Sequence, residues 1–307
     1  MTLFHTFLAV VVAACWGFNF VNVKVGLQEL PPILFSGLRF VFSLLLILVI
    51  PKPAVSWGIL GRIAVFHWIL SFTMIFLSMQ LGLSSGIASL VHQTQVFFAL
   101  GIAVLFFRKP VTRYQFCGVL LAFSGMIVIG LDTQLNTQGN IQDSITVIGL
   151  LAALAAALSW AIANIFYQQI GKADALAVIV WSSLIPPIPL LALSLVFEGP
   201  ELIISSLTNV SWVGISCVLY ATIASTWIGA SIWGPLTRTY GAHIVAPYSL
   251  LIPIFGILSG WLFLDEALSP TLGLACALVF TGLAINHLFA AQTSKSLTKM
   301  TEAAEAA

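Results

Sequence analysis

Charged side chains are scarce in this sequence. Asp, Glu, Lys and Arg together make up 7% of the 307 residues, whereas soluble globular proteins contain about 25%. So few charges cannot cover the surface of a water-soluble protein of this length. Hydrophobic residues reach 60%, so we predict a membrane protein that uses the lipid bilayer as its main solvent. The net charge of +1, without a basic cluster, argues against binding of nucleic acid.

Cysteines and cofactor motifs are also sparse. Each of the 4 cysteines lies alone in an apolar run, without a CxxC pair or a metal-ligand spacing. We therefore expect buried free thiols, no disulfide and no metal site. The sequence contains no P-loop and no nucleotide-binding fingerprint, so we expect neither ATP hydrolysis nor a bound cofactor.

Long apolar runs are abundant. Each run has about the 20 residues that a membrane-spanning helix needs and is too long for a buried strand. We therefore predict an all-α membrane protein with ten transmembrane helices, at residues 5–26, 33–50, 60–82, 86–106, 114–131, 145–169, 176–197, 210–235, 242–263 and 270–289.

Basic residues predict the orientation of these helices. If the N-terminus is cytoplasmic, the outer loops contain no Lys or Arg, and only Lys24 and Arg39 lie within spans away from the inner side. Positively charged loops stay on the cytoplasmic side, so we expect both termini there. Residues 132–144 then form a periplasmic linker loop, and residues 290–307 form a cytoplasmic tail.

Five helices on each side of the linker imply an inverted repeat. Because five is odd, residues 145–289 enter the membrane from the side opposite to residues 5–131. Trp160 follows a run of small residues and precedes an Asn, as Trp16 does in the first half. Such a 5+5 duplication around a midplane cavity is typical of transporters.

Polar side chains inside the spans are the candidate cavity residues. Trp16 and Asn19 share a stripe of the first helix, where they could contact a zwitterionic substrate or join helices by hydrogen bonds. His92 and Gln95 share a stripe of the fourth helix at mid-membrane, where His92 could also carry protons. His67 is a weaker candidate because it lies nearer the cytoplasmic end.

The second half supplies further cavity candidates. Trp160 and Asn164 repeat the stripe of the first helix, and Tyr220 and Tyr248 add polar groups to the eighth and ninth helices. Aromatic residues near span ends are usually anchors at the membrane surface. We give this interpretation to Trp57, Trp68 and Trp212.

Structural or gating roles are assigned to one arginine and two prolines. Arg39 could bind a substrate carboxylate or brace helix ends through backbone carbonyls, and its position about two turns from the outer face favours bracing. Pro247 and Pro253 free backbone carbonyls that a cavity or a neighbouring helix must satisfy. Lys24 lies near the outer end of its span, where its long side chain can extend to the interface.

One enzyme motif occurs in the sequence. Residues Gly82 to Gly86 fit GxSxG, which requires a strand–turn–helix elbow with a partner histidine and acid. Here the motif lies in a short turn between two membrane helices, so we favour a chance match. An intramembrane hydrolase that uses Ser84 or Ser85 is the less favoured alternative.

Several phrases carry a family resemblance. They read WGFNFVNVKVGL, SGIASLVHQTQVFFALG, LAALAAALSWAIANIFYQQIG and IWGPLTRTYGAHIVAPYSLLIPIFGILSGWLFLDEAL. Together with the segments between them, about residues 8–289, they resemble the EamA-type exporters of the drug/metabolite transporter superfamily. Many members have Gly-Glu where this chain has Arg108-Lys109, whereas Asp265-Glu266 keeps the acidic form in the second half.

The resemblance implies a transporter and not an enzyme. It implies a multi-pass protein of the bacterial inner membrane that exports amino-acid metabolites such as O-acetylserine or cysteine by alternating access. The expected partners are small zwitterionic amino acids, the lipid bilayer and protons as candidate coupling ions. The alternatives are an exporter of other amino acids or drugs, and a receptor or assembly protein without transport.

Overall fold

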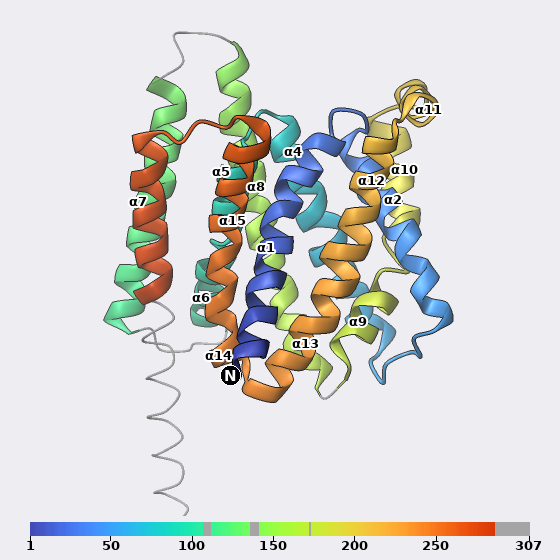
Figure 1. The fold of residues 1–307 in the computed structure, drawn as a ribbon, viewed down its shortest axis with the longest axis horizontal. Coiled ribbons are helices and arrows are strands. Elements are labelled where there is room, and N and C mark those ends of the chain that lie inside the picture. The colour runs from blue at the N-terminus through green and yellow to red at the C-terminus, as the bar shows by residue number, and fades with distance from the viewer. Residues whose placement is uncertain (107–111, 136–140, 172, 286–307) are drawn as a thin grey trace, which may run out of the picture.

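The computed structural model describes residues 1–106, 112–135, 141–171 and 173–285. Every regular element in these ranges is a helix (Figure 1). The chain up to residue 135 forms α1 (Leu3–Gly26), α2 (Pro32–Ser43), the 3₁₀ segment η1 (Leu44–Leu48), α3 (Trp57–Ile63), the π-helical segment η2 (Ala64–Ser71), α4 (Phe72–Gln80), α5 (Ser85–His92), α6 (Gln95–Leu105) and α7 (Arg113–Leu135).

The later part of the chain is built in the same way. It forms α8 (Ile141–Tyr167), the 3₁₀ segment η3 (Gln168–Ile170), α9 (Ala175–Ser182), α10 (Pro187–Phe197), α11 (Pro200–Asn209), α12 (Trp212–Tyr220), the π-helical segment η4 (Ala221–Ile228), α13 (Gly229–Tyr240), α14 (Ala242–Val245), the 3₁₀ segment η5 (Ala246–Leu250), α15 (Leu251–Leu264) and a final helix at Pro270–Ile285.

Six helices in the described ranges are long and apolar enough to cross a membrane. They are Leu3–Gly26, Trp57–Gln80, Ser85–Leu105, Val147–Ile170, Trp212–Tyr240 and Pro247–Leu264. The pair α9 and α10, bent by 42°, makes a seventh if it counts as one span, and three shorter apolar helices are Pro32–Leu48, Arg113–Ile129 and Pro270–Ile285. The all-helical membrane fold is therefore present. The count of ten spans, the 5+5 repeat and the cytoplasmic termini stay predictions.

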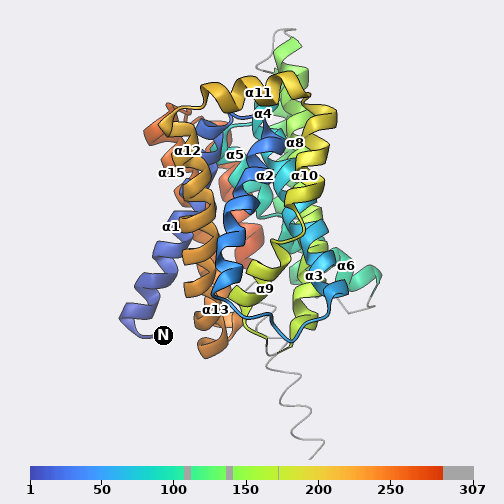
Figure 2. The same cartoon turned by 90° about the vertical axis from the view of Figure 1, so that its right-hand side faces the viewer.

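Most of these helices run side by side in one bundle (Figure 1). α11 instead lies across one end of it (Figure 2), where the sequence predicts only a loop. Gly199, with φ of 82°, ends α10, and Pro200 begins the new helix. Proline is favoured in the first turn because the amide it lacks would be unpaired there.

Several spans are interrupted where the sequence predicts continuous helices. The span at 86–106 breaks between α5 and α6, where the Thr94 hydroxyl donates to the Val91 carbonyl at 2.6 Å. Hydroxyls that bond back to the preceding turn bend helices. The third and eighth predicted spans each contain a π-helical segment, η2 and η4. Such segments are frequent at functional sites.

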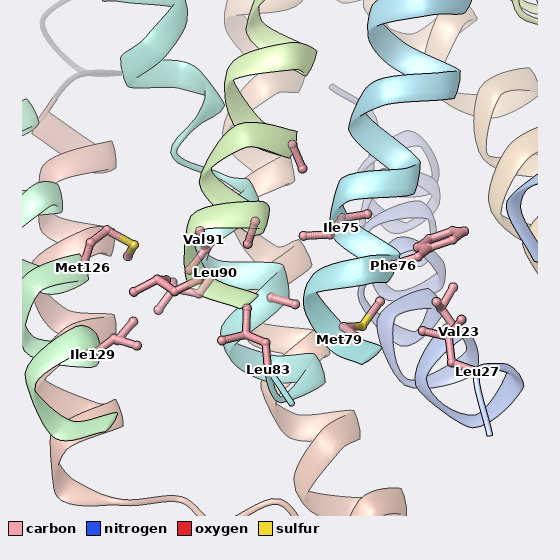
Figure 3. Close-up of a cluster of buried hydrophobic side chains, with 14 of the residues drawn as sticks. Val23, Leu27, Ile75, Phe76, Met79, Leu83, Leu90, Val91, Met126 and Ile129 are labelled. Atoms are coloured by element: carbon pink, nitrogen blue, oxygen red, sulfur yellow. The ribbon is translucent and has the colours of Figure 1, made fainter. Parts of the chain in front are cut away.

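A large apolar core joins α1, α4, α5 and α7 at the end of the bundle where α1 finishes (Figure 3). Val23 and Leu27 of α1 lie at one side of this core, and Met126 and Ile129 of α7 lie at the other. Side chains of α4 and α5 fill the space between them.

Candidate functional site

Two histidines and a tryptophan meet in the interior of the bundle. The ring centroid of Trp160, on α8, lies 4.2 Å from that of His67 and 4.7 Å from that of His92. Phe72 also stacks on His67, at 5.5 Å between centroids, and lies 6.0 Å from Trp160. Both histidines are at least nine-tenths buried, at 6% and 8% exposure. We call these four residues the His–Trp cluster.

Hydrogen bonds fix the two histidines of the cluster. His67 Nδ1 lies 2.7 Å from the hydroxyl of Tyr167, and His92 Nε2 lies 3.3 Å from the hydroxyl of Ser71. His67 Nε2 has no hydrogen-bond partner among the described residues. A buried polar atom without a partner is costly, so this nitrogen is available to a ligand.

A weaker polar pair lies one turn beyond Trp160. The Asn164 side-chain amide donates to Gln95 Oε1 at 3.4 Å. Four residues predicted to line one cavity, His92, Gln95, Trp160 and Asn164, are thus brought together by α5, α6 and α8.

Arg39 borders the cluster from α2. Its guanidinium lies over the Phe72 ring at 4.2 Å, and its Nη2 donates to the hydroxyl of Thr226 in η4 at 2.6 Å. The side chain is 2% exposed. This contact joins α2 to η4 through a side-chain hydroxyl and not through a backbone carbonyl. The structural or gating role of Arg39 stays a prediction.

α1 forms a second polar wall against η4 and α12. Trp16 Nε1 donates to the Ser225 carbonyl at 2.7 Å, and the Asn22 amide donates to the Cys217 carbonyl at 2.9 Å. Asn19 lies between them on the same stripe and is 7% exposed. Its Oδ1 has no partner among the described residues. Trp16 is therefore engaged in helix packing, whereas Asn19 keeps a free acceptor.

Two predicted cavity residues lie away from the cluster. The Tyr220 hydroxyl donates to the Cys15 carbonyl at 3.0 Å, and Tyr248 packs against a separate small core that includes Ala9 and Leu236. Of the two prolines, Pro253 is buried in α15 and Pro247 is exposed in η5. The structure shows no contact that tests the gating role of either proline.

His67 is the member of the cluster that the sequence analysis ranked too low. Ser71 lies four residues after His67, on the same helix face, and it contacts His92. This spacing of two polar residues was the sequence signal that could have placed His67 in the interior. Trp68 is not a surface anchor, since it is 3% exposed and its Nε1 donates to the Ser182 hydroxyl at 2.7 Å. By contrast, Trp212 is 84% exposed, as expected.

Lys24 also differs from its predicted role. Its ammonium donates to the backbone carbonyls of Met79 and Leu83, at 3.0 and 2.8 Å. The first of these carbonyls lies at the end of α4, where it also accepts the backbone amide of Gly82 at 3.2 Å. Lys24 thus joins α1 to the turn after α4 instead of reaching to the interface.

Three glutamates join helices at the end of the bundle where α1 finishes (Figure 1). Glu198 accepts two backbone amides at the start of α2, at 2.6 and 3.0 Å. Glu266 accepts two at the start of α5, also at 2.6 and 3.0 Å. Glu29 accepts the amide and hydroxyl of Ser211, the N-cap of α12, at 2.7 and 2.6 Å. We call these contacts the carboxylate ties.

The carboxylate ties use the free amides and positive dipole of helix N-termini. Each one joins a residue from before residue 140 to a residue from after it, so all three hold the two parts of the chain together. The hydrogen bonds from Ser211 hold the pKa of Glu29 below its ordinary value, because they stabilise the ionised carboxylate.

The serines of the GxSxG match are part of helix capping. Ser84 Oγ accepts the amide of Ile87, and the backbone amide of Ser85 is bound by Glu266. Among the described residues, no histidine bonds to either hydroxyl. The nucleophile, base and acid arrangement of a hydrolase is therefore not formed by the described part of the chain.

Comparison with known proteins defines the class to which this helical membrane fold belongs. A sequence model of the EamA-like transporter family matches residues 3–131 and 147–288. The chain belongs to this family, and it is a transporter and not an enzyme.

Individual relatives agree with that assignment. The chain is 35% identical over 284 residues to a "Probable amino-acid metabolite efflux pump" of Escherichia coli K12, covering 91% of this chain and 93% of that protein. It is 36% identical over 285 residues to a protein of the same name from Salmonella typhimurium LT2, with the same coverage. A solved crystal structure with 17% identity aligns with a TM-score of 0.60 over 95% of this chain and 99% of that one. This last likeness shows the fold alone.

Proposed function

We propose that this transporter exports small zwitterionic amino-acid metabolites, in the class of O-acetylserine and cysteine. The observation that carries the proposal is a set of buried polar atoms without partners among the described residues. The set includes Asn19 Oδ1, His67 Nε2 and two nitrogens of Arg39. Buried polar groups are normally hydrogen-bonded, and a small ligand with both donors and acceptors would satisfy these.

The names of two relatives support the amino-acid class. The proteins of Escherichia coli and Salmonella typhimurium, each named as a probable amino-acid metabolite efflux pump, match this chain over nine-tenths of its length. A more distant relative, 22% identical, is named as an inner membrane transporter. We accordingly place this protein in the bacterial inner membrane, with both termini in the cytoplasm.

The mechanism that we propose is alternating access by two five-helix halves. The π-helical segments support this division, because η2 lies in the third predicted span of one half and η4 in the third span of the other. The carboxylate ties support it too, since breaking them would let the halves part at the end that we assign to the periplasm. The substrate would then enter from one side and leave from the other.

Proton coupling is a further part of the proposal. His92 is the candidate carrier, because it contacts Trp160 in the interior and its ring can exist in two charge states. The three tie carboxylates lie at one end of the bundle and are bonded to helix N-termini, so we do not assign them this role.

Transport in proteoliposomes tests the function. We expect labelled cysteine and O-acetylserine to be moved, and Trp160→Ala to lower the rate at least tenfold because the cluster loses its central ring. Trp212→Ala, at an exposed position, is the matched control and should leave the rate unchanged.

A panel of other amino acids and cationic drugs separates the alternatives. Transport of one of these, without transport of cysteine or O-acetylserine, would refute the substrate class. The transport rate is also measured with proton gradients imposed in each direction. An equal rate with and without a gradient would refute proton coupling.

A further inference from the structure

Arg39 is the largest side chain buried completely in the described part of the protein. An arginine side chain has five N–H donors and carries its charge at all ordinary pH values. Thr226 accepts one donor, from Nη2. Nε and Nη1, which carry three of the five, have no hydrogen-bond partner among the described residues.

No protein carboxylate offsets this charge in the described ranges. The one salt bridge found there joins Arg238 and Asp174 at 3.2 Å, and both of those side chains are more than half exposed. Buried charges in proteins are normally paired. A buried guanidinium with free donors and no counterion therefore has the features of a site for an anion that is not part of the protein.

The surroundings of Arg39 hold the guanidinium in one orientation. Phe72 covers one face of it at 4.2 Å, and Phe40 lies 5.6 Å away. The bond to Thr226 fixes one nitrogen, so the free nitrogens lie on the remaining edge. Phe72 also stacks on His67, whose Nε2 is likewise unpartnered. Arg39 thus borders the His–Trp cluster through Phe72, which contacts both the guanidinium and the His67 ring.

We propose that the free edge of Arg39 binds the carboxylate of the transported molecule. This inference rests on the proposed function and adds the group that recognises the substrate. A planar guanidinium suits a carboxylate because several N–H donors can bond its two oxygens at once. The protein should therefore distinguish amino acids from their amides and esters, which keep the ammonium but carry no negative charge.

Substrate analogues test this in the wild-type protein. Cysteine, cysteinamide and cysteine methyl ester compete for uptake of labelled cysteine into proteoliposomes. We expect the amide and the ester to compete about tenfold or more weakly than cysteine, as expected for loss of a charge-assisted bond. Equal competition by all three compounds would overturn the inference.

Substitutions then assign the effect to Arg39. Arg39→Lys keeps the charge but loses the planar fork, so we expect the KM for cysteine to rise about tenfold or more and the preference over the ester to shrink. Arg62→Lys is the matched control, because Arg62 lies over Phe166 at 5.5 Å at a different site. A preference that persists unchanged in a folded Arg39→Lys protein would contradict the proposal.

A binding measurement separates failure of this inference from failure of the proposed function. Tryptophan fluorescence of the purified wild-type protein is titrated with cysteine and with cysteinamide. Absence of all transport, together with selective binding of cysteine, would refute the exporter function but keep the carboxylate site. Transport of cysteine without selectivity for the carboxylate would refute the site but keep the function.

Discussion

Trp16 shows that a polar residue on the predicted cavity stripe can be committed to packing. Its N–H is bonded to the Ser225 carbonyl, and its ring lies 5.0 Å from that of Trp233. A Cβ atom added at Gly229 would lie 2.5 Å from Trp16 Nε1, so α13 approaches the indole as closely as a glycine allows. Such tight contact leaves no room for a substrate at this nitrogen.

We therefore predict that Trp16→Phe affects stability and not substrate affinity. The Ser225 carbonyl would lose its donor, which costs about 1 kcal/mol. Thermal unfolding in detergent should occur at a lower temperature, with an unchanged KM for cysteine. Trp212→Phe, at 84% exposure, is the control and should change neither quantity. A raised KM with normal stability would place Trp16 in the substrate path.

At the scale of single residues, helical spacing predicted which polar groups face inward but not which keep free atoms. Asn19 and Asn22 lie on one stripe, yet only Asn22 has its amide bonded to a carbonyl of the neighbouring helix. That difference depends on where α12 places its backbone, which no local pattern encodes. The free nitrogens of Arg39 could not be predicted for the same reason.

At the scale of helices, close approach depends on glycine. A Cβ atom at Gly256 in α15 would lie 2.5 Å from Ser89 Oγ and 2.8 Å from Ser89 Cβ. We predict that Gly256→Ala forces α15 away from α5 and lowers the free energy of unfolding by about 1–3 kcal/mol. Gly273→Ala is the control, because nothing lies within 4 Å of the added atom. Thermal unfolding checks both, and equal stability of the two variants would contradict this account of the contact.

The carboxylate ties give a second prediction for the helices. Replacing Glu29, Glu198 or Glu266 by Gln removes a charge at a helix N-terminus, worth about 0.3–1 kcal/mol. We expect the tied end to open more often, about two- to fivefold. The measurement is labelling of Cys217, which is 4% exposed, by an impermeant thiol reagent in a protein whose other cysteines are replaced by Ser.

The control for the ties is Glu201→Gln. This glutamate is exposed in the first turn of α11 and makes none of the ties. Its replacement should leave the labelling rate of Cys217 unchanged. Rates that are equal in all four variants would show that the ties do not hold this end closed.

The sequence predicted the approximate position of the helices better than their shape. Each of the ten predicted ranges overlaps an apolar helix or helix pair. The bend between α9 and α10 and the π-helical segments were not predicted, because hydropathy reports length and polarity and not backbone geometry. α11 was missed since it is short and lies outside the apolar runs that served as the signal.

At the scale of the whole molecule, closure of the tied end should depend on pH through Glu29. Its pKa is below the ordinary value of 4.5 because Ser211 stabilises the ionised form. The tie is therefore fully present above pH 4.5 and is lost as the pH falls through the lowered pKa.

Hydrogen exchange at the start of α12 checks this expectation. Protection of the Val213 and Gly214 amides should be greater in the wild type than in Glu29→Gln when both are measured at the same pH above 4.5. The two proteins should converge at lower pH, where the carboxyl is protonated. Equal protection in the two proteins already at neutral pH would contradict a lowered pKa of Glu29.

The membrane class and the family could be predicted from the sequence, because the composition indicates a membrane protein and the quoted phrases resemble those of the family. The contacts between the two parts of the chain were not. Glu198 and the start of α2 are separated by more than 160 positions, and their pairing becomes visible only when the helices are packed. The same holds for His67 and Trp160.

The two π-helical segments have a consequence for how such a bundle can move. A π turn contains one residue more than an α turn, so a shift of its position along a helix exchanges only the few backbone hydrogen bonds of that turn. Migration past Thr226 would rotate that hydroxyl away from Arg39, while the ends of the helix stay in place. η2 could turn His67 in the same manner. A change of side-chain register inside these two helices would then accompany the movement of the two halves.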